Sequence, residues 1–324
     1  MQTYVLRRIL INIPVIFMVA TLVYFATSVL PGDFAAQRIA AQNPIETTDL
    51  AVREAQIEKI KDDLGLSGPV WKRYLTYIGN MTRGDFGESF QTREPALSGF
   101  AAGLPYTLQL SIMTLLIGIA VALPVGIISA IRQDTWLDYV LRFFAMFSLG
   151  APNFWVATML LLYVVRFRLW TIDLTGHPLL WEDPVASMKL FVIPAVAGGV
   201  ASAAGTMRLL RSQMLEVLRE DYVRTAWAKG LRERQVVMRH ALKPALIPVV
   251  TSFGLAIATL IAGNVVFESI FGIPGVGFRI LAAIRARDIP VVQAFVVILA
   301  TTVVFTNLAV DVLYGYLDPR IRLS

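Results

Sequence analysis

Six windows of the sequence are apolar and carry no charged residue. They cover residues 9–30, 95–131, 143–165, 190–207, 244–267 and 289–310, with charged or polar segments between them. A helix needs about 20 apolar residues to cross the hydrocarbon core of a bilayer, so each window can hold one span. The pattern predicts an all-α polytopic membrane protein with six transmembrane helices.

Proline and glycine modify this picture within the windows. The second window is long for one helix, and Gly103-Leu-Pro105 predicts that its helix begins there. Pro124 and Pro152 lie inside the second and third spans, where proline bends a helix and leaves backbone carbonyls to be satisfied by neighbours or water. Either a transport path or ordinary bundle packing accounts for them. The small residues of 195–207 permit close helix packing or leave room for a pore, and both alternatives stay open.

Composition and charge agree with the membrane assignment. Hydrophobic residues make up 56% of the chain and charged residues 16%. The net charge of +6 follows the positive-inside rule, because the short loops with Arg7, Arg8, Arg132 and Arg142 fall on one side. Both termini are therefore expected in the cytoplasm, and the basicity predicts no nucleic-acid partner. The first window is too long for a secretory signal and has a poor cleavage site, so we expect an uncleaved span.

The windows divide the chain into three parts. Residues 1–30 form the predicted N-terminal transmembrane helix, 31–100 an external (periplasmic) segment, and 101–324 a five-helix core. Within the external segment, 51–64 has helical periodicity, and Gly65 is a plausible stop. The element Gly84-Asp-Phe-Gly-Glu-Ser89 is either an ordinary capping loop or a surface that receives an external partner.

A basic segment over 219–248 separates two spans and is the most distinctive stretch of the chain. It predicts a short helix from Asp221 to Lys229, with Asp221 as N-cap and Gly230 in a left-handed conformation after the last turn. Val223, Ala226 and Trp227 share one apolar face of that helix. Because so short a helix is unstable alone in water, it needs a surface or a groove to bind.

The order of residues in this segment resembles the EAA-type signature of the membrane subunits of ABC importers. Only Ala226, Gly230 and Leu242 match the general signature. The match is far better to the variant of the dipeptide, oligopeptide and nickel permeases, through 221–231, 239–242 and 246–248. Residues 264–277 and the ending 318–322 resemble the same family, so the resemblance covers essentially the whole chain.

The resemblance implies a type I ABC importer-like transmembrane domain whose helix at 221–230 is a coupling helix that docks into a separate ATPase subunit. The residues implied in docking are Tyr222, Val223, Arg224, Thr225, Ala226, Trp227, Ala228, Lys229 and Gly230, supported by Asp221, His240 and Leu242. Arg224, Thr225 and Trp227 depart from the acidic-Ala-Ala consensus, so the consensus acidic contact is not transferred. Trp227 is instead expected to supply buried area in the ATPase cleft.

The implied partners are a second homologous permease subunit, two ATP-binding subunits, an external substrate-binding protein and the lipid bilayer. No phosphate-binding loop occurs in the sequence, so ATP and Mg²⁺ are expected on the ATPase subunits, and this chain is expected to bind no cofactor and to be no enzyme. With no cysteine and two histidines, no metal site is expected. The implied function is ATP-driven import of peptides by alternating access; nickel chelates or another small solute are the alternative cargo.

Two further points concern the pathway and the rival functions. Pro152, Asn264 and Glu268 are candidates for the translocation path or its external mouth, although Asn264 and Glu268 at i, i+4 are equally explained by packing. An ion-gradient-driven secondary transporter would place ionisable residues deep in the spans, which the uncharged windows argue against. A membrane scaffold that binds a partner through the same basic helix is the other rival, and substrate-stimulated ATP hydrolysis would exclude it.

Overall fold

The computed structural model describes residues 2–29, 55, 58–59, 62, 67–172 and 176–317, with side chains for all of these except 2–5, 29, 251, 255–263 and 313–317. Within that part of the chain the regular structure is helical, apart from one isolated bridge between Glu88 and Pro95. The helix expected at 51–64 falls mostly, and the ending 318–322 entirely, outside the described residues.

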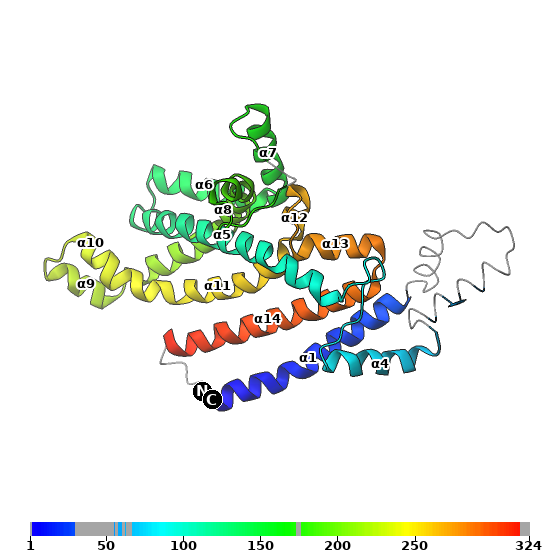
Figure 1. Cartoon of the computed structure of the whole chain (residues 1–324). Helices are drawn as coiled ribbons and strands as arrows, with labels where there is room; N and C mark the ends of the chain where they lie inside the picture. The colour runs from blue at the N-terminus through cyan, green and yellow to red at the C-terminus, as the bar shows by residue number, and fades with distance from the viewer. Residues whose placement is uncertain are drawn as a thin grey trace.

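Five long helices form the bundle (Figure 1). They are α1 (Gln2–Val29), α5 (Ala96–Ile131), α8 (Pro184–Val217), α11 (Leu242–Gly263) and α14 (Ile289–Leu317). In the described residues, α1, α5, α8 and α14 are long and apolar enough to cross a membrane. At 1.5 Å per residue, the 22 residues of α11 also extend about 33 Å, which matches the hydrocarbon thickness.

Two pairs of shorter helices are sharply bent. The pair α6 (Trp136–Gly150) and α7 (Asn153–Arg166) turns by 101°, and the pair α12 (Val265–Phe271) and α13 (Val276–Ala286) turns by 83°. Counting each bent pair as one broken span would raise the four apolar spans to six, and α11 is outside that count. The break between α6 and α7 falls at Ala151-Pro152, where proline cannot donate to the preceding turn. The bend at Pro152 was expected from the sequence, but its size was not.

The prediction that the second span begins near Gly103-Leu-Pro105 is wrong, because α5 runs unbroken from Ala96. The first turns of α5 pack Ala96 and Phe100 against Phe295 of α14, which offsets the hydrogen bond that Pro105 cannot make. Gly103 serves close approach: a Cβ there would lie 2.9 Å from the Val276 nitrogen.

The small residues of the fourth window bring α8 against α5, the most extensive helix pair in the described bundle. A Cβ at Gly199 would lie 2.8 Å from Cγ2 of Ile117 and 2.9 Å from the carbonyl oxygen of Thr114. Gly198 approaches Thr114 in the same way. Among the two alternatives for this stretch, the structure therefore shows close helix packing at these glycines.

Helix α1 lies along α14 and also carries α4 (Val70–Thr82), which the sequence analysis did not predict. Tyr24 of α1 stacks on Tyr77 with ring centroids 5.2 Å apart, and the hydroxyls of Thr21 and Tyr74 are 2.8 Å apart. Between α1 and α14, Arg8 and Asp311 form an ion pair at 3.0 Å. Contacts with α1 thus hold α4 in place, although the sequence of α4 is too interrupted to predict a helix.

Candidate coupling site

A short helix, α9 (Asp221–Ala228), lies at one end of the bundle, together with α10 (Glu233–Gln235) and the π-helix η1 (Val236–Ala241). We call these three elements the coupling end, and Figure 1 shows them projecting beyond the long helices at the left. Helix α9 is where the sequence predicted it. Asp221 is not the N-cap: Glu220 occupies that position in an extended conformation, and its side chain makes no capping bond. Gly230 has φ of +77°, as the predicted left-handed position requires.

The inner face of α9 is held by a small apolar cluster. Val223 and Ala226 are buried with Val236, and Val217 and Leu218 at the end of α8 pack against them. The hydroxyl of Tyr222 donates to the carbonyl oxygen of His240 at 3.4 Å. Desolvation by partial burial raises the pKa of that hydroxyl, and the nearby charge of Glu220 adds to the effect.

The three apolar residues expected on one face of α9 lie on two different faces. Trp227 does not join Val223 and Ala226 inside, since 42% of it is exposed, and Tyr222 is 46% exposed. Thr225, Ala228 and Lys229 are exposed beside them. Arg224 forms an ion pair with Asp221 at 3.5 Å on the surface, and such an exposed pair contributes little to stability. The helix therefore has one face that seats it on its own chain and one that presents two aromatic rings outward.

We call the apolar cluster around Val223 the seat of α9, and the π-helix connects this seat to the bundle. Val237 and Ala241 are buried with Leu210 and Met214 of α8 and with Ala245 and Val249 of α11. His240 lies in η1, and Leu242 is the first residue of α11. The sequence analysis did not predict the π-helical register of this segment. Through η1 and the end of α8, a displacement of α9 would reach both long helices.

The opposite end of the bundle carries the other candidate residues. We call the loop 84–95, α12, α13 and Asp288 the opposite end. Asn264 and Glu268 are buried there. The amide of Asn264 donates to the Ser111 hydroxyl at 2.7 Å, and the Thr107 hydroxyl donates to the Glu268 carboxylate at 2.6 Å. Both are packed against α5, and their assignment to an external mouth stays a prediction, as does that of Pro152, which is exposed at the start of α7.

Glycines shape the turn around the buried carboxylate. The backbone N–H of Phe278 donates to Glu268 at 2.9 Å, and that of Val276 donates to the Thr107 hydroxyl at 2.9 Å. A Cβ at Gly277 would lie only 2.6 Å from Cα of Val265, and Gly275 lies against the Glu268 carboxylate. The sequence identified the Asn264–Gly277 loop as distinctive, but not its partner Thr107, which lies 161 positions away from Glu268 along the chain.

The loop 84–95 closes this end from another direction. The hydroxyl of Ser89 donates to the Asp288 carboxylate, and the N–H of Phe90 donates to the same carboxylate at 3.0 Å. Gly84 and Gly87 both have positive φ, so the glycines of this element are required by its turns. These bonds show that the loop caps the α13–α14 corner, and they leave open whether it also receives a partner.

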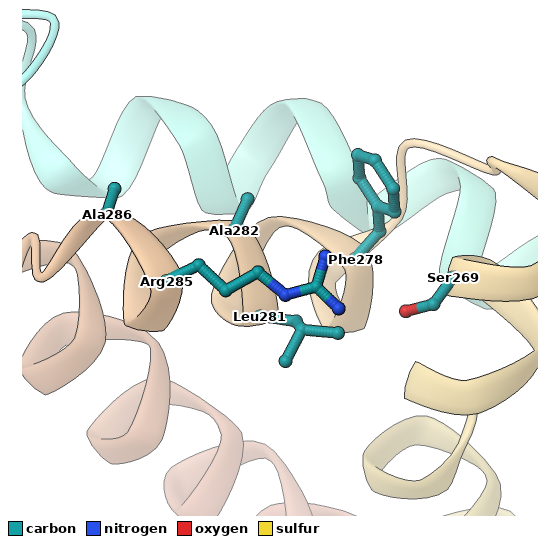
Figure 2. Close-up of a pocket in the computed structure, with 6 residues that line it drawn as sticks. All are labelled: Ser269, Phe278, Leu281, Ala282, Arg285 and Ala286. Atoms are coloured by element: carbon teal, nitrogen blue, oxygen red, sulfur yellow. The ribbon is translucent and has the colours of Figure 1, made fainter.

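A cleft of about 390 Å³ is lined by residues of α12 and α13. In Figure 2 the Arg285 side chain extends along α13 toward Phe278, with Leu281 beside it and Ser269 facing them from α12. The cleft offers one cationic and one aromatic group beside an apolar wall. In the part of the chain that the structure describes, no three His, Asp or Glu side chains are grouped so as to hold a metal ion.

The chain thus combines a helical membrane bundle with a short helix that is packed on it by one face and exposes two aromatic rings on the other. The chain belongs to the family described as "Binding-protein-dependent transport system inner membrane component", whose model matches residues 122–323. It is accordingly a permease subunit located in a membrane and not an enzyme, as the sequence predicted.

Comparison with individual proteins agrees with this assignment. The chain is 37% identical to the di/tripeptide transport system permease protein DppB of Pseudomonas aeruginosa, over 99% of each chain. It is 35% identical to the oligopeptide transport system permease protein AppB of Bacillus subtilis, over 99% of this chain and 100% of the relative. A crystal structure of an amino acid ABC transporter with histidines aligns with a TM-score of 0.50 at 15% identity, covering 69% of this chain and 95% of that one. That last likeness concerns the fold alone.

Proposed function

We propose that this chain is one of two homologous permease subunits of an ATP-driven peptide importer, and that α9 docks into the ATPase. The observation that carries the proposal is the divided surface of α9. Its inner residues are anchored to α8 and η1, while Tyr222 and Trp227 face outward. Large aromatic residues in this position are the groups that most often dominate binding at protein interfaces.

The bundle provides a route from docking to transport. Helix α8 has 34 residues and is about 51 Å long, so it extends from the core to the seat of α9. ATP-driven closure of two ATPase subunits would move α9, and α8 and α11 would follow because both pack on η1. Rotation of the two permeases would then change which side of the pathway is open. ATP and Mg²⁺ belong to the ATPase subunits in this proposal, and an external binding protein delivers the cargo.

The proposed orientation places the coupling end and both termini in the cytoplasm. It is supported by Arg7, Arg8, Arg132 and Arg142 in the segments on that side. The proposed cargo class rests on the relatives, whose names specify dipeptides, di/tripeptides or oligopeptides at full-length coverage. Peptide length is left to the binding protein.

Purification of the tagged chain from its native membrane in mild detergent tests the assembly. A second permease and ATPase subunits should co-purify, and cargo-loaded binding protein should stimulate ATP hydrolysis. Recovery of the chain without any ATPase would contradict the docking role of α9.

Uptake tests the cargo separately. Cells that lack the transporter should regain uptake of a labelled dipeptide or short oligopeptide when the complete system is restored. Restoration of nickel-chelate uptake without peptide uptake would contradict the peptide assignment and leave the docking role intact.

A further inference from the structure

A groove of about 810 Å³ lies between α6 and α8, near the end of α8 that leads to α9. Its polar lining comes from Arg142 of α6 and from Arg208, Arg211 and Ser212 of α8. Its apolar lining includes Met146 and Leu149, which are 68% and 48% exposed. The groove is distinct from the seat of α9 and from the opposite end of the bundle.

One buried carboxylate, Asp138, lies against two of these arginines, Arg142 and Arg211, and its acceptor positions are already occupied. Arg211 donates to Asp138 from Nε at 3.0 Å and from Nη2 at 2.8 Å. The Ser129 hydroxyl and the Asp134 N–H, the latter at 3.1 Å, donate to the same carboxylate. A carboxylate offers about four acceptor sites, so these four donors use its capacity.

Among the described residues, Arg142 and Arg208 therefore have no hydrogen-bond acceptor. The Nε of Arg142 is 3.5 Å from Asp138, and this buried atom has no hydrogen-bond partner; its guanidinium lies 4.7 Å from the centre of the Tyr139 ring. Arg208 is exposed and makes no hydrogen bond or ion pair with the described residues. Three guanidinium groups against one carboxylate leave an excess of two positive charges on the groove.

We propose that this groove binds the headgroup phosphate of an anionic phospholipid, with its acyl chains along Met146 and Leu149. The charge excess selects an anion, and the exposed apolar residues next to it select a molecule with a hydrocarbon part. Basic pockets between spans at the cytoplasmic side are where anionic headgroups bind in other membrane proteins. The leaflet rests on the orientation given under the proposed function, whereas the binding itself requires only that the chain lies in a membrane.

The test is lipid analysis of the whole transporter after purification from vesicles of phosphatidylglycerol and phosphatidylcholine. The variant is Arg208→Gln, because Arg208 holds no other residue in place. Arg132→Gln is the matched control, since Arg132 is an exposed arginine at the end of α5, outside the groove. An arginine beside an anionic headgroup contributes about 1 kcal/mol to its binding, so we expect R208Q, which loses a guanidinium of the groove, to retain about fivefold less phosphatidylglycerol than wild type. R132Q keeps every guanidinium of the groove and should retain the wild-type amount.

Three outcomes would overturn the proposal. Equal retention by R208Q and wild type would show that the groove holds no lipid. Displacement of the bound lipid by inorganic phosphate, in a buffer that contains no sulfate, would assign the groove to a soluble anion. Loss of the second permease from R208Q, with no bound lipid in wild type, would assign Arg208 to an acidic partner surface. Because the readout is bound lipid, each outcome is independent of whether peptides are the cargo.

Discussion

The two ends of the bundle differ in how much of their functional surface is buried within the chain. At the opposite end, Asn264, Glu268 and Ser89 are buried and bonded to residues of α5 and Asp288, so its polar groups are satisfied within the chain. At the coupling end, α9 buries only Val223 and Ala226 and leaves Tyr222 and Trp227 exposed. The first end is therefore stabilised internally, whereas the second exposes the aromatic rings that we propose a partner covers.

The largest effect is expected from a change at the internally stabilised end. Gly277→Ala would place a Cβ 2.6 Å from the Val265 backbone, which cannot rotate away. We expect a loss of about 3 kcal/mol in the free energy of unfolding, from overpacking and disturbance of the Glu268 turn. The measurement is thermal unfolding of the purified transporter. Gly79→Ala is the control, because nothing lies within 4 Å of its added Cβ. Equal melting temperatures for the two variants would contradict this account.

The second prediction concerns the exposed face of α9. Trp227→Ala should leave the fold of this chain intact and weaken ATPase association by about 2 kcal/mol, roughly thirtyfold, because a large aromatic contact is lost from the interface. Binding of the purified ATPase to the permease pair in detergent measures it. Trp136→Ala, at a tryptophan that is 77% exposed on α6, should bind as wild type. Equal affinities of all three proteins would show that Trp227 is not a docking residue.

The third prediction separates the seat of α9 from its contact face. Val223→Ala should cost about 1.5 kcal/mol in stability, through lost burial and a small cavity beneath α9. ATPase association should fall by less than tenfold, since the aromatic rings remain but are held less firmly. The matched control is Val266→Ala at an exposed position of α12, which should alter neither quantity. A stability loss without any change in association would show that the seat does not orient the contact face.

The smallest effect is expected from the surface ion pair on α9. Arg224→Ala removes the 3.5 Å contact with Asp221, and both side chains are largely exposed. The free energy of unfolding should change by less than about 0.5 kcal/mol. A larger loss on thermal unfolding would mean that α9 is stabilised by its own surface charges rather than by the cluster around Val223.

The sequence predicted features that depend on local pattern, and it failed where distant contacts decide. The position of α9 and the left-handed Gly230 follow from the local pattern, although the N-cap is Glu220 rather than Asp221, and the windows located the long helices. The start of α5 was misplaced because Phe100 packs on Phe295, a contact that overrides the local signals of Gly103 and Pro105. Likewise, no local sequence pattern predicts that Glu268 pairs with Thr107 or that η1 packs on α8. The outward direction of Trp227 was also not determined by periodicity, which placed it with Val223.

The most direct test of the account is photo-crosslinking from position 227 in native membranes. A benzophenone amino acid replaces Trp227 in one sample and Trp136 in a control, and the crosslinked products are identified by mass spectrometry. The account predicts that the probe at 227 captures an ATPase subunit while the probe at 136 does not. If the probe at 227 captures only lipid or this chain itself, in a membrane where the assembled transporter is active, α9 is not the docking element.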